Sequence, residues 1–108
     1  MNPVIKRQWV AALRSGKYKQ TRGYLIETSK KEGLSYCPLG VLTRLCARKQ
    51  KKSFSLISDG SGTLSDRVRR FAGLRADDPQ LGRYTISERN DDLNQDFKQI
   101  ARLIENRL

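Results

Sequence analysis

The chain of 108 residues contains no histidine and only two cysteines, Cys37 and Cys46. Two cysteines without histidine cannot supply the four ligands of an ordinary zinc site. Histidine-assisted nucleophilic catalysis is also excluded. On one predicted helix the two cysteines lie about 13 Å apart along the axis, too far for a disulfide bond. Such a pair is typical of free thiols in a reducing compartment.

Long apolar stretches are also missing. No run in the sequence approaches the roughly 20 residues that span a bilayer, and the N-terminus lacks the apolar core of a signal peptide. We therefore expect a cytoplasmic protein that does not associate with membranes. Hydrophobic residues make up 37% of the chain and charged residues 31%, which predicts a single domain over residues 1–108.

Acidic residues are scarce in the first half of the chain. Residues 1–52 contain 13 Lys and Arg but 2 Asp and Glu, whereas residues 53–108 contain 9 of each kind. The net charge of +11 therefore arises entirely in the first half. This asymmetry indicates a polyanionic partner or an acidic protein surface. The alternative interpretation is a solvated basic surface that serves only solubility.

The pattern after Tyr36 predicts a central helix that begins at Pro38, because proline suits the first helical position. Val41, Leu42 and Leu45 recur at helical spacing, so we expect this face to be buried in the core. Gly40 lies beside these residues and permits another backbone to approach closely. The apolar pattern ends in a basic segment that contains Arg48, Lys49, Lys51 and Lys52.

Cap residues and apolar spacing predict three further helices, over residues 3–15, 65–72 and 94–107. Alternating patterns predict three short strands, over residues 24–27, 34–36 and 54–57, of which the first two form a hairpin. Residues 75–84 are expected to form a loop, and residues 86–92 a cap-rich approach to the last helix. We therefore expect a mostly helical α+β fold, with about four helices around a central helix and a small antiparallel ribbon.

The basic segments on either side of this core supply the candidate binding residues. Lysine and arginine neutralise phosphates, and Tyr18 and Tyr24 can stack on exposed bases. The alternative is that both tyrosines pack on the core above a solvated rim. No helix-turn-helix, zinc-finger or RNA-recognition signature is present. The candidate residues are Lys17, Tyr18, Lys19, Arg22, Tyr24, Lys30, Lys31, Arg48, Lys49, Lys51 and Lys52.

Two groups of residues offer catalytic alternatives. Cys37 lies near a predicted helix N-terminus, where the pKa of a thiol can be lowered, but no base is recognisable beside it. Asp91, Asp92 and Asp96 can hold Mg²⁺ or, alternatively, cap the last helix. We predict no catalytic residue, no metal and no cofactor.

Several short motifs follow one another along nearly the whole chain: Trp9, Lys17 to Gln20, Tyr36 to Leu42, Phe71 to Leu74, Asn90, Asp91, and Phe97 to Glu105. Their order resembles that of a family of small, mostly uncharacterised phage and prophage proteins. The sequence departs from that pattern at Arg89, where an apolar residue is usual. The resemblance implies a phage origin and a shared fold, and it supplies no activity.

Taken together, these features predict a small non-enzymatic, phage-type accessory protein. Its basic half is expected to bind nucleic acid or a nucleoprotein complex. The phage origin implied by the resemblance further predicts that this binding inhibits a host defence or nucleic-acid-handling machine. The alternative is a protein-interaction module that docks on an acidic host protein without contacting nucleic acid. The sequence fixes no oligomeric state.

Overall fold

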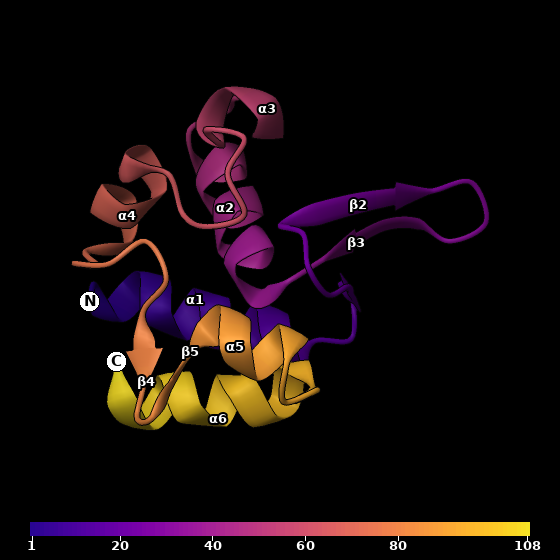
Figure 1. Cartoon of the computed structure of the whole chain (residues 1–108). Helices are drawn as coiled ribbons and strands as arrows, with labels where there is room; N and C mark the ends of the chain where they lie inside the picture. Colours follow the sequence, from indigo (N-terminus) through magenta and orange to yellow (C-terminus); the bar gives the residue numbers. More distant parts are fainter.

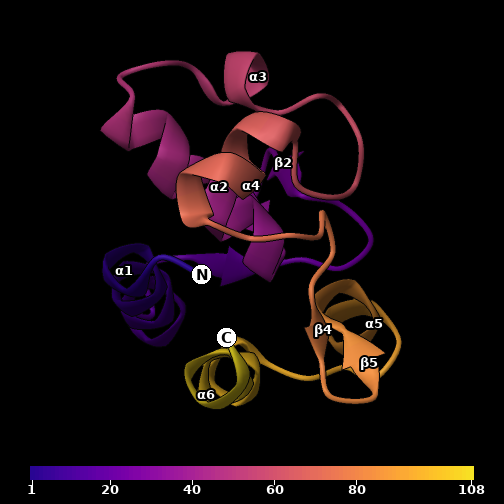
Figure 2. The ribbon, with the colours of Figure 1, turned by 90° about the vertical axis from the view of Figure 1, so that its left-hand side faces the viewer.

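A computed structural model describes residues 1–108 and contains six helices and five short strands, which confirms the α+β fold class. The terminal helices α1 (Pro3–Arg14) and α6 (Phe97–Arg107) run side by side (Figures 1 and 2). Helix α2 (Pro38–Lys49) packs on α1 and contacts three shorter helices, so it is central, as predicted. No helix is long and apolar enough to cross a membrane. One cluster of 23 buried side chains forms the core.

Helix α1 begins as the sequence predicts, because the Asn2 side chain accepts hydrogen bonds from the Val4 and Ile5 N–H groups at 2.9 and 3.1 Å. The fully buried side chain of Trp9 lies on its inner face. The Trp9 indole N–H donates to the Pro38 carbonyl at 2.8 Å, which ties α1 to the first turn of α2.

Helix α2 has Cys37 as its N-cap residue. Gly40 faces the Leu25 backbone so closely that a Cβ there would lie 2.8 Å from the Leu25 carbonyl carbon, which confirms the predicted close approach. Val41 and Leu42 are fully buried. The prediction for Leu45 is wrong, since this side chain is only partly buried and packs at the edge of the core.

The predicted hairpin is present as β2 (Ile26–Ser29) and β3 (Gly33–Tyr36), which pair antiparallel. The first strand begins two residues later than expected, because Leu25 is used to contact Gly40 and to accept the Cys37 N–H. The sequence analysis missed strand β1 (Lys19–Gln20), which pairs parallel with β3 and makes the ribbon a mixed three-stranded sheet.

Residues 54–57 were predicted as a strand, and this is wrong. They form one helical turn, α3 (Phe54–Ile57). A helical turn places Phe54 and Ile57 on the same side, against the core, and leaves Leu56 68% exposed. A strand would instead have directed Phe54 and Leu56 to one face, so burial of Ile57 favours the helical turn.

Helix α4 (Asp66–Ala72) agrees with the prediction, with Ser65 as its N-cap residue and Gly73 in the left-handed conformation after its last residue. The expected loop that follows instead contains a small antiparallel hairpin. It consists of β4 (Gln80–Leu81) and β5 (Tyr84–Thr85).

The cap-rich segment before the last helix is itself a helix, α5 (Ile86–Asp91). Thr85 and Glu88 form a reciprocal capping box at its start. Helix α6 begins three residues later than predicted, because Asn94 has a φ of +53° that a right-handed helix does not allow. Asp96 instead caps α6 by accepting the Gln99 N–H at 2.8 Å.

Candidate nucleic-acid interface

Three aromatic rings form a row along one side of α2. Tyr18 and Tyr36 meet edge to face, with ring centres 5.4 Å apart. The ring centre of Phe54 lies 6.4 Å from that of Tyr36. Tyr36 is buried, whereas the two outer rings are half-buried. We call Tyr18, Tyr36 and Phe54 the aromatic row.

Two arginines of α2 lie over this row. The guanidinium carbon of Arg44 is 5.8 Å from the centre of Tyr36 and 5.0 Å from that of Phe54, and its Nε donates to Tyr36 Oη at 3.2 Å. The guanidinium carbon of Arg48 is 5.8 Å from the Tyr18 ring centre, and its Nη1 donates to Tyr18 Oη at 2.9 Å. Cation–π contacts of this kind stabilise arginine on aromatic faces.

The C-terminus of α2 carries the predicted basic residues, which we call the α2 basic cluster: Arg48, Lys49, Lys51 and Lys52. The helix ends in a Schellman motif, because the Lys52 N–H donates to Ala47 O at 2.9 Å and the Lys51 N–H to Arg48 O at 3.2 Å. The left-handed position of this motif, φ +54°, is occupied by Lys51 rather than glycine. An L-residue costs about 1–2 kcal/mol in this conformation.

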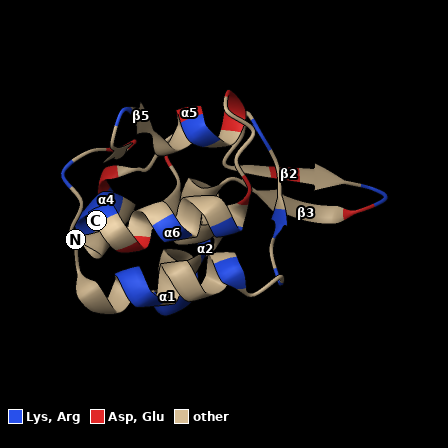
Figure 3. Ribbon diagram, turned by 90° about the horizontal axis from the view of Figure 1, so that it is seen from below, with Lys and Arg blue, Asp and Glu red and all other residues tan.

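The outer side of Tyr18 faces solvent through two shallow hollows. Lys17 and Arg48 line one of them, beside the outer face of α1. Arg14, Lys98 and the carboxylate of Asp96 line the other, which lies between α1 and the start of α6. Figure 3 marks Lys and Arg positions in blue on the ribbons of both terminal helices. Tyr18 therefore lies among cations that come from three separate parts of the chain.

Few of these cations have an acidic partner. The structure contains two salt bridges, Arg14–Glu105 at 3.0 Å and Arg69–Asp66 at 3.5 Å. All nine lysine and arginine side chains among the predicted binding residues are exposed, and none of them forms a salt bridge. Their positive charge is therefore available to a partner.

The structure brings only some of the predicted binding residues together. Lys17, Tyr18 and Arg48 line one hollow, and the rest of the α2 basic cluster continues from Arg48. Lys30 and Lys31 lie at the tip of the β2–β3 hairpin, which projects away from the helices (Figures 1 and 3). These two predicted binding residues therefore lie away from the α2 basic cluster.

Three other predicted residues line neither of the hollows beside Tyr18. Lys19 lies in β1, and Arg22 is exposed in the turn that follows. Tyr24 is 61% exposed and lines a different hollow from Tyr18. The alternative that both tyrosines pack on the core holds in part for Tyr18, whose ring contacts Tyr36, and does not hold for Tyr24.

Sequence reasoning missed Arg44 and Lys98. Arg44 lies in the central helix, whose apolar spacing predicts only the face that is buried. No local pattern in the sequence predicts that Arg44 lies over Phe54. Lys98 belongs to the half of the chain with no net charge, and it joins this surface only because α6 packs beside α1. The apolar spacing of the two terminal helices predicts that both pack on the core. It does not predict which of their cations lie close together.

A polar network fixes the segment after Tyr18. Gln20 Nε2 donates to Asn90 Oδ1 at 2.6 Å, and Asn90 Nδ2 donates to Thr21 O at 2.9 Å and to Asp91 Oδ1 at 2.8 Å. Asp91 Oδ1 also accepts the Gly23 N–H at 2.9 Å. Asn90 is fully buried, and no buried side-chain N or O lacks a partner. The network therefore holds residues 20–23 firmly against α5.

The geometry of the structure is unfavourable for both catalytic alternatives, the Cys37 nucleophile and the Asp91, Asp92 and Asp96 metal site. Burial raises the pKa of Cys37 to about 11, although its sulfur accepts the Gly40 N–H at 3.4 Å, so the thiol is protonated at neutral pH. This is the opposite of the lowered pKa considered from its position. No group of three or more Cys, Asp or Glu side chains is arranged to hold a metal ion. Asp91 and Asp96 instead accept the backbone hydrogen bonds described above.

The molecule is thus a small α+β domain with a cationic surface built around aromatic side chains. The chain belongs to the family described as DUF8296, a domain of unknown function, whose model matches residues 1–108. No curated protein and no solved structure shows a significant match to it. The family description names no host, activity or partner, so the phage origin implied by the motifs stays a prediction.

Proposed function

We propose that this protein binds single-stranded nucleic acid through the α2 basic cluster and the surface around Tyr18, without catalysing a reaction. The observation that supports the proposal best is the absence of carboxylate partners for the nine exposed cations among the candidate residues. Phosphates of a nucleic acid would neutralise these cations and release counterions, which drives such binding.

The aromatic side chains favour a single strand over a duplex. Proteins that bind single strands combine a cationic groove with aromatic rings on which bases stack. Tyr18 supplies a half-buried ring between two hollows, and Arg48 lies over it.

Lys51 adds independent support. Glycine is the residue that a Schellman motif favours at the left-handed position, and lysine there reduces stability. A strained residue of this kind is often kept for function, and Lys51 lies within three positions of three other cations in the sequence, Arg48, Lys49 and Lys52. A phosphate-binding role gives a reason for lysine at this position.

The resemblance to phage and prophage proteins supports a biological setting for this activity. In that setting the protein acts in the host cytosol as an accessory protein that binds a nucleic acid or nucleoprotein complex. Its effect there is inhibition of a host defence or nucleic-acid-handling machine. This part of the proposal rests on the short motifs and on no contact in the structure.

Titration of fluorescently labelled RNA and DNA single strands at physiological salt tests the proposal. We expect binding to both polymers, with log K falling linearly against log salt by about 0.7 for each phosphate contact. Binding of a matched duplex should be weaker. Absence of binding to every polymer would reject the proposal and favour docking on an acidic protein.

A further inference from the structure

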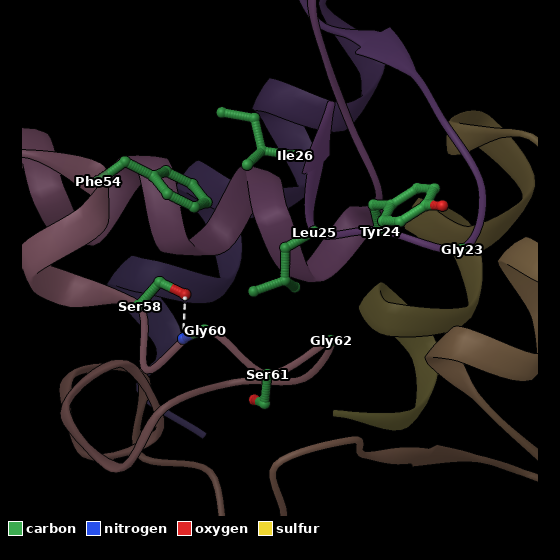
Figure 4. A pocket seen from close by; sticks show the side chains of 9 residues that line it. All are labelled: Gly23, Tyr24, Leu25, Ile26, Phe54, Ser58, Gly60, Ser61 and Gly62. Carbon is green, nitrogen blue, oxygen red and sulfur yellow. Dashed lines mark hydrogen bonds between the residues drawn. The ribbon is translucent and has the colours of Figure 1, made fainter. Parts of the chain in front are cut away.

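A hollow of about 270 Å³ lies at the opposite end of the aromatic row from Tyr18. Residues Gly23 to Ile26 form one wall, the loop from Ser58 to Gly62 forms the other, and Phe54 lies at one end (Figure 4). Sites for drug-sized molecules have volumes of roughly 300–1,000 Å³. This hollow is therefore suited to one small ring system rather than to a whole nucleotide cofactor.

The lining combines an apolar surface with unused hydrogen-bond donors. Leu25, Ile26 and Phe54 provide apolar contacts, and the 61% exposed ring of Tyr24 lies at the rim. The backbone N–H groups of Tyr24 and Gly62 donate to no acceptor within the protein. A flat ring with acceptor atoms on its edge fits these features, because the faces can stack and the edge can accept these bonds.

The charge near this hollow favours a ligand attached to phosphates. Arg44 lies 5.0 Å from the centre of the Phe54 ring and forms no salt bridge. No carboxylate lines the hollow, and the neighbouring Asp59, which stays ionised, accepts the Ser61 N–H at 3.0 Å and the Ser61 hydroxyl at 2.6 Å. A base that carries its own phosphate is therefore a better match than a neutral aromatic side chain.

We propose that this hollow binds one unstacked base of a single-stranded nucleic acid whose phosphates contact Arg44 and the α2 basic cluster. The aromatic row connects the two places, since Phe54 lines the hollow and Tyr18 contacts Arg48. This inference rests on the proposed function, and it adds a second binding site for a base to a surface on which Tyr18 already offers a ring for stacking.

The test compares an intact oligothymidine with an abasic oligonucleotide of the same length and charge. We expect the intact strand to bind about tenfold more tightly, as stacking of one base provides. Equal affinities would overturn the base site and stacking on Tyr18, while salt-dependent binding of the abasic strand would leave the proposed phosphate-binding function intact. Absence of binding by both strands would overturn both proposals.

A bulky side chain at a residue that lines the hollow tests whether the preference arises there. Gly62 has no positive φ, and a Cβ there would have no atom within 4 Å, so Gly62→Leu is expected to fold. It should reduce binding of the intact strand about tenfold, to the level of the abasic one. Leu56→Ala, on the exposed side of α3, is the control and should retain the preference. Retention of the preference by Gly62→Leu would overturn the assignment.

Discussion

Arg48 Nη1 donates a hydrogen bond to Tyr18 Oη at 2.9 Å, across 30 positions of the sequence. The contact joins the C-terminal end of the central helix to the segment just after α1. It holds the guanidinium over the tyrosine ring, where the planar cation keeps other donors free for a phosphate. The proposed binding surface is built around this pair.

Replacement of Lys51 should separate stability from binding. Lys51→Gly relieves the left-handed backbone strain, so we expect a gain of up to about 1 kcal/mol in the free energy of unfolding. The same change removes a phosphate contact and should weaken binding of single strands.

Lys52→Gly is the matched control, because it removes a charge at a residue whose φ is not positive. It should lower both the free energy of unfolding and the affinity for single strands. Urea denaturation and oligonucleotide titration measure the two effects. Unchanged binding by Lys51→Gly would show that this lysine has no functional role.

Gly40→Ala should be strongly destabilising. The added methyl group would meet the Leu25 backbone, which cannot move without separating Cys37 from the Leu25 carbonyl that accepts its N–H at 3.1 Å. We expect a loss of about 3 kcal/mol or more in the free energy of unfolding, at the upper end for overpacked cores. Gly62→Ala is the control and should change stability by less than about 0.5 kcal/mol. Thermal and urea denaturation measure both variants, and similar stabilities would contradict the close packing of α2 on this segment.

The network at Asn90 should couple to the segment that carries Tyr18. Asn90→Ala removes three hydrogen bonds at a fully buried position, with an expected loss of about 1–3 kcal/mol. Hydrogen exchange should accelerate at the Gly23 amide. This amide donates to Asp91 Oδ1, which loses its hydrogen bond from Asn90 Nδ2 in the variant. A double-mutant cycle with Gln20→Ala should give a coupling of about 0.5 kcal/mol or more. Strict additivity would mean that the two side chains act independently.

Cys37 should make stability depend on pH in the alkaline range. Its pKa is about 11 in the folded protein, against an ordinary value of 9.0, so the folded state keeps a proton that the unfolded state loses. Its contribution to stability is complete below pH 9 and is lost as pH rises towards 11, at about 1.4 kcal/mol for each pH unit.

Cys37→Ser is the variant that tests this dependence, because serine retains a side chain that can cap α2 and does not titrate in this pH range. The stability of the wild type should therefore fall more steeply than that of Cys37→Ser between pH 9 and 10.5. Parallel curves would contradict the burial of this thiol.

The sequence predicts those elements whose ends are specified locally. Asn2, Ser65 and Gly73 fix helix ends through their own side chains or their own backbone, and apolar spacing fixes the buried faces of α1, α2 and α6. The shorter elements depend on contacts between distant residues. The single turn α3 is selected by burial of Phe54 and Ile57 together, and two residues of β1 form a strand only because β3 lies beside them.

The candidate binding surface, too, is predicted by the sequence only where its residues are close together in the chain. The count of charges along the chain finds the α2 basic cluster and Lys17, since these residues are adjacent in sequence. It cannot find Lys98, which reaches the surface through the packing of α6, nor the contact of Arg44 with Phe54. It also groups Lys30 and Lys31 with the cluster, whereas the hairpin carries them away from it.

The most direct test of nucleic-acid binding compares two variants that each lose four positive charges. One replaces the α2 basic cluster with glutamine, and the other replaces four exposed arginines of the second half, Arg67, Arg70, Arg75 and Arg83. Arg69 is left unchanged because it pairs with Asp66 and donates to Leu74 O. Both variants have the same net charge, so a difference between them reports position rather than total charge.

The measurement is the affinity for a labelled single strand as a function of salt. We expect the cluster variant to lose binding and to reduce the slope of log K against log salt by up to about 3, as four lost phosphate contacts require. The second variant should keep most of the wild-type slope. Equal losses in both variants, or no binding by the wild type, would contradict a binding surface at the end of α2.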